Sequence, residues 1–301
     1  MGKKSKRNTP KPNSNRAEKL AERRAAQEQA STAVVRPFEG LAAECDLVAM
    51  REFVPTATAP LTLRDGNRLL NLATVLPGAV AALVRSEDDV PTGYIAVQVQ
   101  AEPADPAVGF GFSAQWATTV EPGESLNSAP LDAVTPTFAD IVDADAVLDI
   151  TVHKDFNWWI PEGVAPDAEV AATVERANQA IMPSARLDGL NAAWWVDAGD
   201  KAHLRWVRPE GEDDLMLALA RLHAAGKLNL GEGSRFAGSF RTHGLLVPVF
   251  DLDNERHASE WTPAATELGE RLVEALAIDT PLTSEERRSR DGIRSRQVTL
   301  R

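Results

Sequence analysis

The sequence of 301 residues is poor in cysteine and tyrosine, with one residue of each. The single cysteine, Cys45, excludes an intramolecular disulfide and a four-cysteine zinc site, which fits a reducing compartment. Cys45 lies between Glu44 and Asp46, and neighbouring carboxylates disfavour a thiolate, so we expect an inert core residue. The cysteine content therefore predicts a cytoplasmic protein.

The sequence also lacks a long apolar run. The longest, VLPGAVAALV at 75–84, contains Pro77 and Gly78, and it is far shorter than the ~20 residues that a helix needs to cross a bilayer. The N-terminal residues MGKKSKRNTPKPNSNR are followed by AEKLAERRAAQEQA, which has charges where a secretory signal needs apolar side chains. We therefore predict no membrane contact and no secretion.

Motifs for nucleotide binding are missing as well. The stretch GEGSRFAGSFRTHGLLVPVF at 231–250 offers Gly231, Gly233 and Gly238 for a phosphate cradle, but such a cradle needs a strand before its glycines and a helix after them. Here the pattern predicts a helix before and a strand after. We expect a β-hairpin that turns at 242–244, and no cofactor.

Hydrolytic and metal-binding patterns are equally weak. Ser234 or Ser239 could form a triad with His243 and Asp251, but no G-x-S-x-G motif is present, and we interpret His243 as a solvated turn residue. The segment DLDNERH at 251–257 resembles the start of a calcium loop, yet Arg256 stands where that loop needs glycine. We therefore predict no metal site.

The charge of the sequence is unevenly distributed. The net charge is −12, but residues 1–30 hold nine basic and three acidic residues, so the rest of the chain carries −18. An acidic body repels polyanions, so contact with a polyanion such as ribosomal RNA is expected at the basic ends. The candidate nucleic-acid-binding residues are Lys3, Lys4, Lys6, Arg7, Lys11, Arg23 and Arg24.

Composition divides the chain into five segments. Residues 1–33 have few large apolar side chains and are expected to form a disordered basic tail. An N-terminal α+β domain at 34–120 and a C-terminal one at 137–281 are expected on either side of a Pro/Gly/Ser-rich linker at 121–136. Residues 282–301 form a basic C-terminal segment.

In the first half, the pattern predicts a helix near 41–53 and a hairpin with a two-residue turn at Asp65 and Gly66. It also predicts a short helix at 77–84 and strands at 92–100 and 109–120. In the second half it predicts a strand at 150–153, a helix at 166–181, strands on either side of 197–200, a helix at 210–226 and a helix from Thr262. These elements predict an α+β fold with mixed or antiparallel sheets and packed helices. Their similar order at 39–120 and 166–252 suggests an internal duplication of a helix, hairpin, helix and two strands.

Tryptophan is common, with seven residues. Trp158, Trp159, Trp194, Trp195 and Trp206 all fall in the expected C-terminal domain. Adjacent residues of a strand point to opposite faces, so one member of each pair could stack on a ligand while the other is core. The alternative is that both faces are buried. These five residues and His243 are the candidate ligand-binding residues.

Four stretches together resemble one uncharacterised family of high-GC Gram-positive bacteria, a domain of unknown function. They are RPFEGLAAECDLVAMREFVPTATAPLTL, AHLRWVRPEGEDDLMLALARLHAAG, LGEGSRFAGSFRTHGLLVPVFDL and TPLTSEERRSRDGIRSRQVTL, and the resemblance covers residues 34–301. It implies no catalytic residues. Some members carry an N-terminal zinc motif of the SEC-C type, which this sequence lacks, so neither zinc nor a translocase role follows.

The sequence therefore favours a non-enzymatic cytosolic binding or adaptor protein, with an acidic body for an unknown protein partner and a basic tail for a polyanion. The alternative is a small-molecule hydrolase or transferase with its cleft near the Trp-rich sheet. A pocket in which His153, His203 or His243 meets a buried carboxylate would favour the enzyme.

Overall fold

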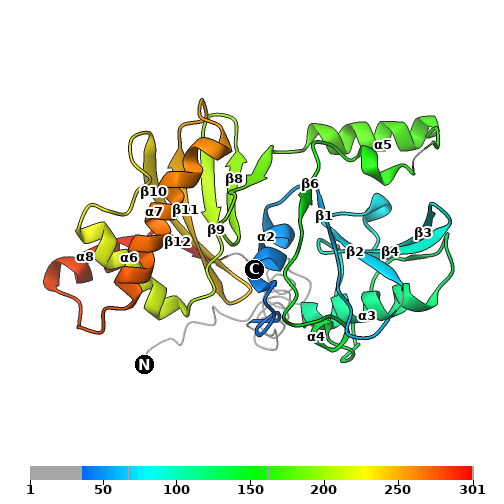
Figure 1. Ribbon diagram of the computed structural model, residues 1–301, viewed down its shortest axis with the longest axis horizontal. Helices are drawn as coiled ribbons and strands as arrows, with labels where there is room; N and C mark the ends of the chain where they lie inside the picture. The colour runs from blue at the N-terminus through cyan, green and yellow to red at the C-terminus, as the bar shows by residue number, and fades with distance from the viewer. Residues whose placement is uncertain (1–35, 67, 162, 300–301) are drawn as a thin grey trace, which may run out of the picture.

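The computed structural model describes residues 36–66, 68–161 and 163–299. The predicted basic tail and its candidate nucleic-acid-binding residues lie outside this range. The described chain forms two six-stranded sheets that lie side by side, with helix α2 between them (Figure 1). Both sheets are mixed and helices pack on them, which confirms the predicted α+β class.

The first sheet has the strand order β5-β3-β4-β2-β1-β6, and all its pairs are antiparallel except β2 with β4. Its strands are β1 (Ala57–Pro60), β2 (Leu69–Ala73), β3 (Ala82–Glu87), β4 (Val90–Ala96), β5 (Ser125–Leu126) and β6 (Thr151–Val152). The short 3-10 helix η1 (Pro77–Ala79) connects β2 to β3. Helix α3 (Pro106–Thr119) packs against β2, β3 and β4, and α4 (Phe138–Ile141) packs on α3.

Three predictions for this half need correction. The short helix expected at 77–84 is a 3-10 helix at 77–79 only, and residues 82–84 belong to β3. The hairpin of β1 and β2 exists, but its connection spans 61–68 instead of two residues, because Leu63 leaves the hairpin to bridge Val142. Residues 109–119 of the strand expected at 109–120 belong to α3 instead. Asp105 caps that helix by accepting a hydrogen bond from the Ala107 amide at 2.9 Å, and Pro106 occupies its first turn.

The second sheet has the order β12-β10-β11-β9-β8-β7, with only β10 and β12 parallel. Its strands are β7 (Ser184–Arg186), β8 (Ala193–Asp197), β9 (Ala202–Trp206), β10 (Ser234–Thr242), β11 (Leu245–Leu252) and β12 (Gln297–Thr299). One face packs on α6 (Glu212–Ala224), α7 (Ala258–Leu276) and α8 (Ser284–Arg294). Helix α5 (Ala168–Gln179) lies in the connection between the two sheets (Figure 1).

Helix α2 (Glu44–Glu52) joins the two halves. All its residues from Glu44 to Met50 are buried, which includes two carboxylates. The apolar side chains of α2 share one core with the first sheet and with Trp194, Val196, Leu245 and Val247 of the second. The other face of the second sheet has a separate core beneath its helices.

The expected linker and the start of the expected C-terminal domain both contribute strands to the first sheet. Residues 125–126 form β5, so the segment at 121–136 contributes to the first sheet, and β6 at 151–152 also belongs to that sheet. The internal duplication is not confirmed, since β2 and β4 are parallel whereas β9 and β11 are antiparallel at the corresponding place. Within the described ranges, no helix combines the length and the apolar character that a membrane span requires.

Candidate ligand-binding cavity

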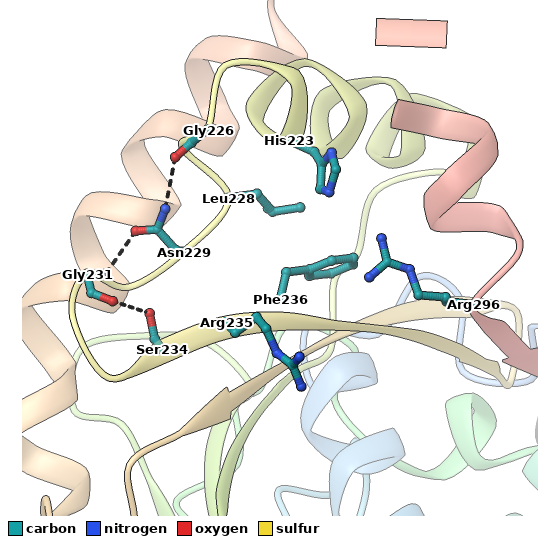
Figure 2. A pocket seen from close by; sticks show the side chains of 9 residues that line it. All are labelled: His223, Gly226, Leu228, Asn229, Gly231, Ser234, Arg235, Phe236 and Arg296. Atoms are coloured by element: carbon teal, nitrogen blue, oxygen red, sulfur yellow. Dashed lines mark hydrogen bonds between the residues drawn. The ribbon is translucent and has the colours of Figure 1, made fainter. Parts of the chain in front are cut away.

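The glycine-rich stretch at 231–250 folds as the predicted hairpin, and its beginning also lines a cavity of about 570 Å³. The cavity lies between the start of β10, the loop that follows α6, and the chain that leaves α8 (Figure 2). The residues that line it are His223, Gly226, Leu228, Asn229, Gly231, Ser234, Arg235, Phe236 and Arg296.

Polar groups of the loop hold one wall in place. The Asn229 side chain donates a hydrogen bond to the Gly226 carbonyl at 3.0 Å and accepts one from the Gly231 amide at 2.9 Å. The Ser234 hydroxyl donates to the Gly231 carbonyl at 2.7 Å and accepts from the Leu230 amide at 2.8 Å. These groups are engaged with the loop itself, so we assign them to shaping the wall.

A second wall depends on Gly238. The register of β10 and β11 shifts between Phe236 and Gly238, where Gly238 has a φ of 151°. A side chain there would place its Cβ 3.1 Å from the Arg296 carbonyl oxygen. The missing side chain therefore lets the last part of the chain approach β10 and add β12 to the sheet, which brings Arg296 to the cavity.

The side-chain groups that remain free to bind a ligand in the cavity are cationic or neutral. His223 and Arg296 gather with Leu228 around the ring of Phe236 (Figure 2). The His223 Nδ1 lies 3.1 Å from the Ser289 hydroxyl, and the Arg296 Nε donates to the Gly292 carbonyl at 3.3 Å. The His223 Nε2 and the terminal nitrogens of Arg296 have no hydrogen-bond partner among the described residues.

Arg235 differs from these two side chains. It points away from Phe236 (Figure 2), and its Nη2 lies 2.7 Å from an oxygen of Asp251. Its charge is paired with that carboxylate, so we assign it no contact inside the cavity. None of the nine lining residues is Asp or Glu.

The five candidate tryptophans do not form one site. Trp194 and Trp195 point to opposite faces of the second sheet, as predicted, with Trp194 fully buried in the core around α2 and Trp195 packed against the core beneath the helices. Trp206 is buried in that second core. Trp158 and Trp159 belong to the 3-10 helix η2 (Asn157–Trp159), which packs against the first sheet and not the second.

The half-buried side chains of Trp158 and Trp159 in η2 are held by hydrogen bonds. The Trp158 indole donates to the Thr56 hydroxyl at 3.0 Å and stacks on the His153 ring at 5.3 Å between centroids. The Trp159 indole donates to the Val75 carbonyl at 3.0 Å. Both indoles therefore anchor η2 on the first sheet.

His243 does not lie in solvent as expected. It occupies the hairpin turn, but its side chain is 16% exposed, and its Nε2 lies 2.9 Å from Glu52 and 3.1 Å from the Arg51 Nε. Burial alone would raise the pKa of Glu52, but the hydrogen bond and charge of His243, with the charge of Arg51, hold that pKa below its usual value. This pair connects α2 to the second sheet, and neither residue lines the cavity of Figure 2.

The remaining candidates for a reactive or metal-binding site are His203, Cys45 and the acidic side chains. His203 lies 3.3 Å from Asp251, whose carboxylate also pairs with Lys201 and Arg235. Burial, followed by the carboxylates of Glu44 and Asp46, raises the pKa of Cys45 to about 12, which keeps the thiol protonated. In the part of the chain that the structure covers, no three His, Cys, Asp or Glu side chains are grouped to hold a metal ion.

The comparison with known proteins gives one finding. A sequence model described as "Family of unknown function (DUF5926)" matches residues 37–301. No curated protein and no solved structure matches the chain. The chemistry of the cavity must therefore be inferred from its own residues.

Proposed function

We propose that this chain, which belongs to the family of unknown function DUF5926, is a non-enzymatic cytosolic binding protein that holds an anionic ligand in the cavity of Figure 2. The single observation that carries the proposal is the charge of the lining. Three of the nine lining residues are Arg or His and none is acidic, although the whole chain carries a net charge of −12.

A positive hollow in an acidic protein attracts anions selectively. A concave surface lined by one sign of charge concentrates counter-ions, while the negative surface around it repels them. A guanidinium matches the geometry of a carboxylate or phosphate, because two parallel N–H groups can reach two oxygens. The Arg296 guanidinium and the free nitrogen of His223 are the groups we assign to this contact.

The contacts of His223 favour binding over catalysis. A serine nucleophile needs a histidine base that a third group, usually a carboxylate, orients. His223 contacts the Ser289 hydroxyl, and the described contacts give it no carboxylate. The histidines that do meet a carboxylate, His243 and His203, do not line this cavity.

Titration calorimetry of the intact protein with inorganic pyrophosphate in a low-salt buffer tests the proposal. We expect saturable binding that Arg296→Gln weakens by about 10-fold or more, since a hydrogen bond to a charged group contributes about 1.5–3 kcal/mol. Arg294→Gln is the matched control, because Arg294 is on α8 and pairs with Asp213 outside the cavity. Absent binding, or equal affinity in both variants, would refute the site.

The sequence supports a second contact, between the basic residues 1–33 and a polyanion such as RNA. Replacing Lys3, Lys4, Lys6 and Arg7 with glutamine should weaken RNA binding and reduce its salt dependence, measured by fluorescence anisotropy. Unchanged binding would exclude this contact. The alternative function, a hydrolase or transferase near the tryptophans, would be supported by a turnover that Trp158→Ala or Trp195→Ala abolishes while the fold is retained.

A further inference from the structure

A second hollow, of about 670 Å³, runs along α7 on the helical side of the second sheet. We call it the α7 groove. Its floor is Trp206, one side is the chain at 207–209, and the other side is the face of α7 that carries Gly269, Glu270, Val273 and Glu274.

The floor of the α7 groove is built tightly. A Cβ on Gly269 would lie 3.1 Å from the Trp206 ring, so glycine lets α7 lie close to the indole. The Trp206 Nε1 donates a hydrogen bond to the Asn191 carbonyl at 3.0 Å, and the Arg208 guanidinium lies 4.8 Å from the ring centroid. The groove is therefore a preformed surface.

The rim of the α7 groove combines apolar surface with negative charge. Val273 is 62% exposed and gives the rim an apolar side chain. It stands between Glu270 and Glu274 on α7, and both are exposed. The one basic lining residue, Arg208, is already paired with Glu210. This combination suits a segment that has basic side chains and some apolar ones.

The first described residue contacts one end of this groove through its side chain. This residue, Arg36, donates from Nη2 to the carbonyl of Pro209, a lining residue, at 3.0 Å. The same guanidinium pairs with the buried carboxylate of Glu44 at 2.6 and 2.7 Å. The backbone of Arg36 therefore lies within one arginine side chain's reach of Pro209. By sequence, the chain that precedes Arg36 ends in Val34 and Val35 and holds nine basic residues against three acidic ones.

We propose that the α7 groove binds the basic N-terminal segment of the same chain, residues 1–35. Reach is no obstacle, because ten extended residues span about 33 Å and the groove from Thr266 to Glu274 follows α7 for about 12 Å. Covalent linkage gives the segment an effective concentration in the millimolar range. The charge pairs at the rim are exposed, so salt weakens the contact, and a polyanion competes for the same basic side chains.

Zero-length carbodiimide cross-linking of the intact protein tests this proposal, because it joins lysine amines to carboxylates that they contact. Five of the eight lysines lie in residues 1–35, so products from this segment are easily recognised by mass spectrometry. We expect these lysines to join Glu270 and Glu274 at least fivefold more than Glu169 and Glu175, exposed carboxylates on α5. The yield should not change on dilution.

A charge placed in the groove provides the discriminating variant. Val273→Arg keeps both glutamates and adds no amine, and it should reduce the cross-links to Glu270 and Glu274 at least fivefold. Val170→Arg, at an exposed valine on α5, is the matched control and should leave them unchanged. Equal cross-linking of α5 and α7, persistence in Val273→Arg, or products that join two isotopically distinct copies would each overturn the proposal. Pyrophosphate affinity is a separate measurement, so this test does not depend on the cavity of Figure 2.

Discussion

Asp46 is a charged residue buried in the core. Its side chain is 4% exposed, one oxygen lies 2.8 Å from the Arg186 guanidinium, and the other oxygen has no partner among the described residues. Burial raises the pKa of Asp46 to about 6, which outweighs the opposite effect of Arg186. At neutral pH the carboxylate is still ionised, so burial of its charge lowers the stability of the fold.

This predicts an unusual pH dependence for Asp46. The pKa in the folded state exceeds the unfolded value of 3.8, so the penalty is fully present above pH 6 and decreases as the pH falls from 6 towards 4. Relative to Asp46→Asn, the wild type should gain about 1.4 kcal/mol between pH 7.5 and 5. Chemical denaturation of both proteins at each pH measures the difference. Parallel pH profiles would show that Asp46 does not titrate in this range.

At the scale of elements, the hairpin of β10 and β11 both forms part of the second sheet and shapes the ligand-binding cavity. His243 and Gly244 both have positive φ, 45° and 76°, as a two-residue turn between twisted strands requires. The bulge at Gly238 lets β12 join the sheet and thereby positions Arg296. One element therefore provides both the turn and the arrangement of the cavity.

Gly238→Ala tests the positioning role of the bulge. The new methyl group would approach the Arg296 carbonyl to 3.1 Å, so the end of the chain must shift. We expect several-fold weaker pyrophosphate binding and a loss of stability of about 1 kcal/mol from the positive φ. Gly199→Ala is the control, because Gly199 also has a positive φ, 88°, but a methyl group there would meet no other atom within 4 Å. If both variants bind pyrophosphate equally, the bulge does not position Arg296.

At the scale of the whole molecule, α2 connects two sheets through buried charges. Arg186 at the end of β7 reaches Asp46, and His243 in the hairpin turn reaches Glu52. Arg51 extends this contact to the first half, where it pairs with Glu102 and donates to the Val97 carbonyl at 2.9 Å. The two halves are therefore joined by an apolar core and by ionic contacts along one helix.

A double-mutant cycle measures the contribution of one such contact. His243→Ala leaves Glu52 partly buried without its partner, which should lower the free energy of unfolding by about 1–3 kcal/mol. The double variant His243→Ala with Glu52→Gln should be more stable than the sum of the single effects predicts, since the unpaired charge is gone. Strictly additive effects would show that the pair does not couple the two halves.

The sequence alone determined the elements whose signals are local. The patterns at 41–53 and 166–181 predicted α2 and α5, and the turn residues at 242–244 predicted the hairpin, because propensity and periodicity act between close neighbours. Only the tertiary structure decided that 109–119 is helical, that His243 meets Glu52, and that residues 223–236 form a cavity with Arg296. Those outcomes depend on contacts between residues that lie far apart along the chain. Gly111 illustrates the reason, since a Cβ there would overlap the Pro136 carbonyl, a constraint that no local pattern contains.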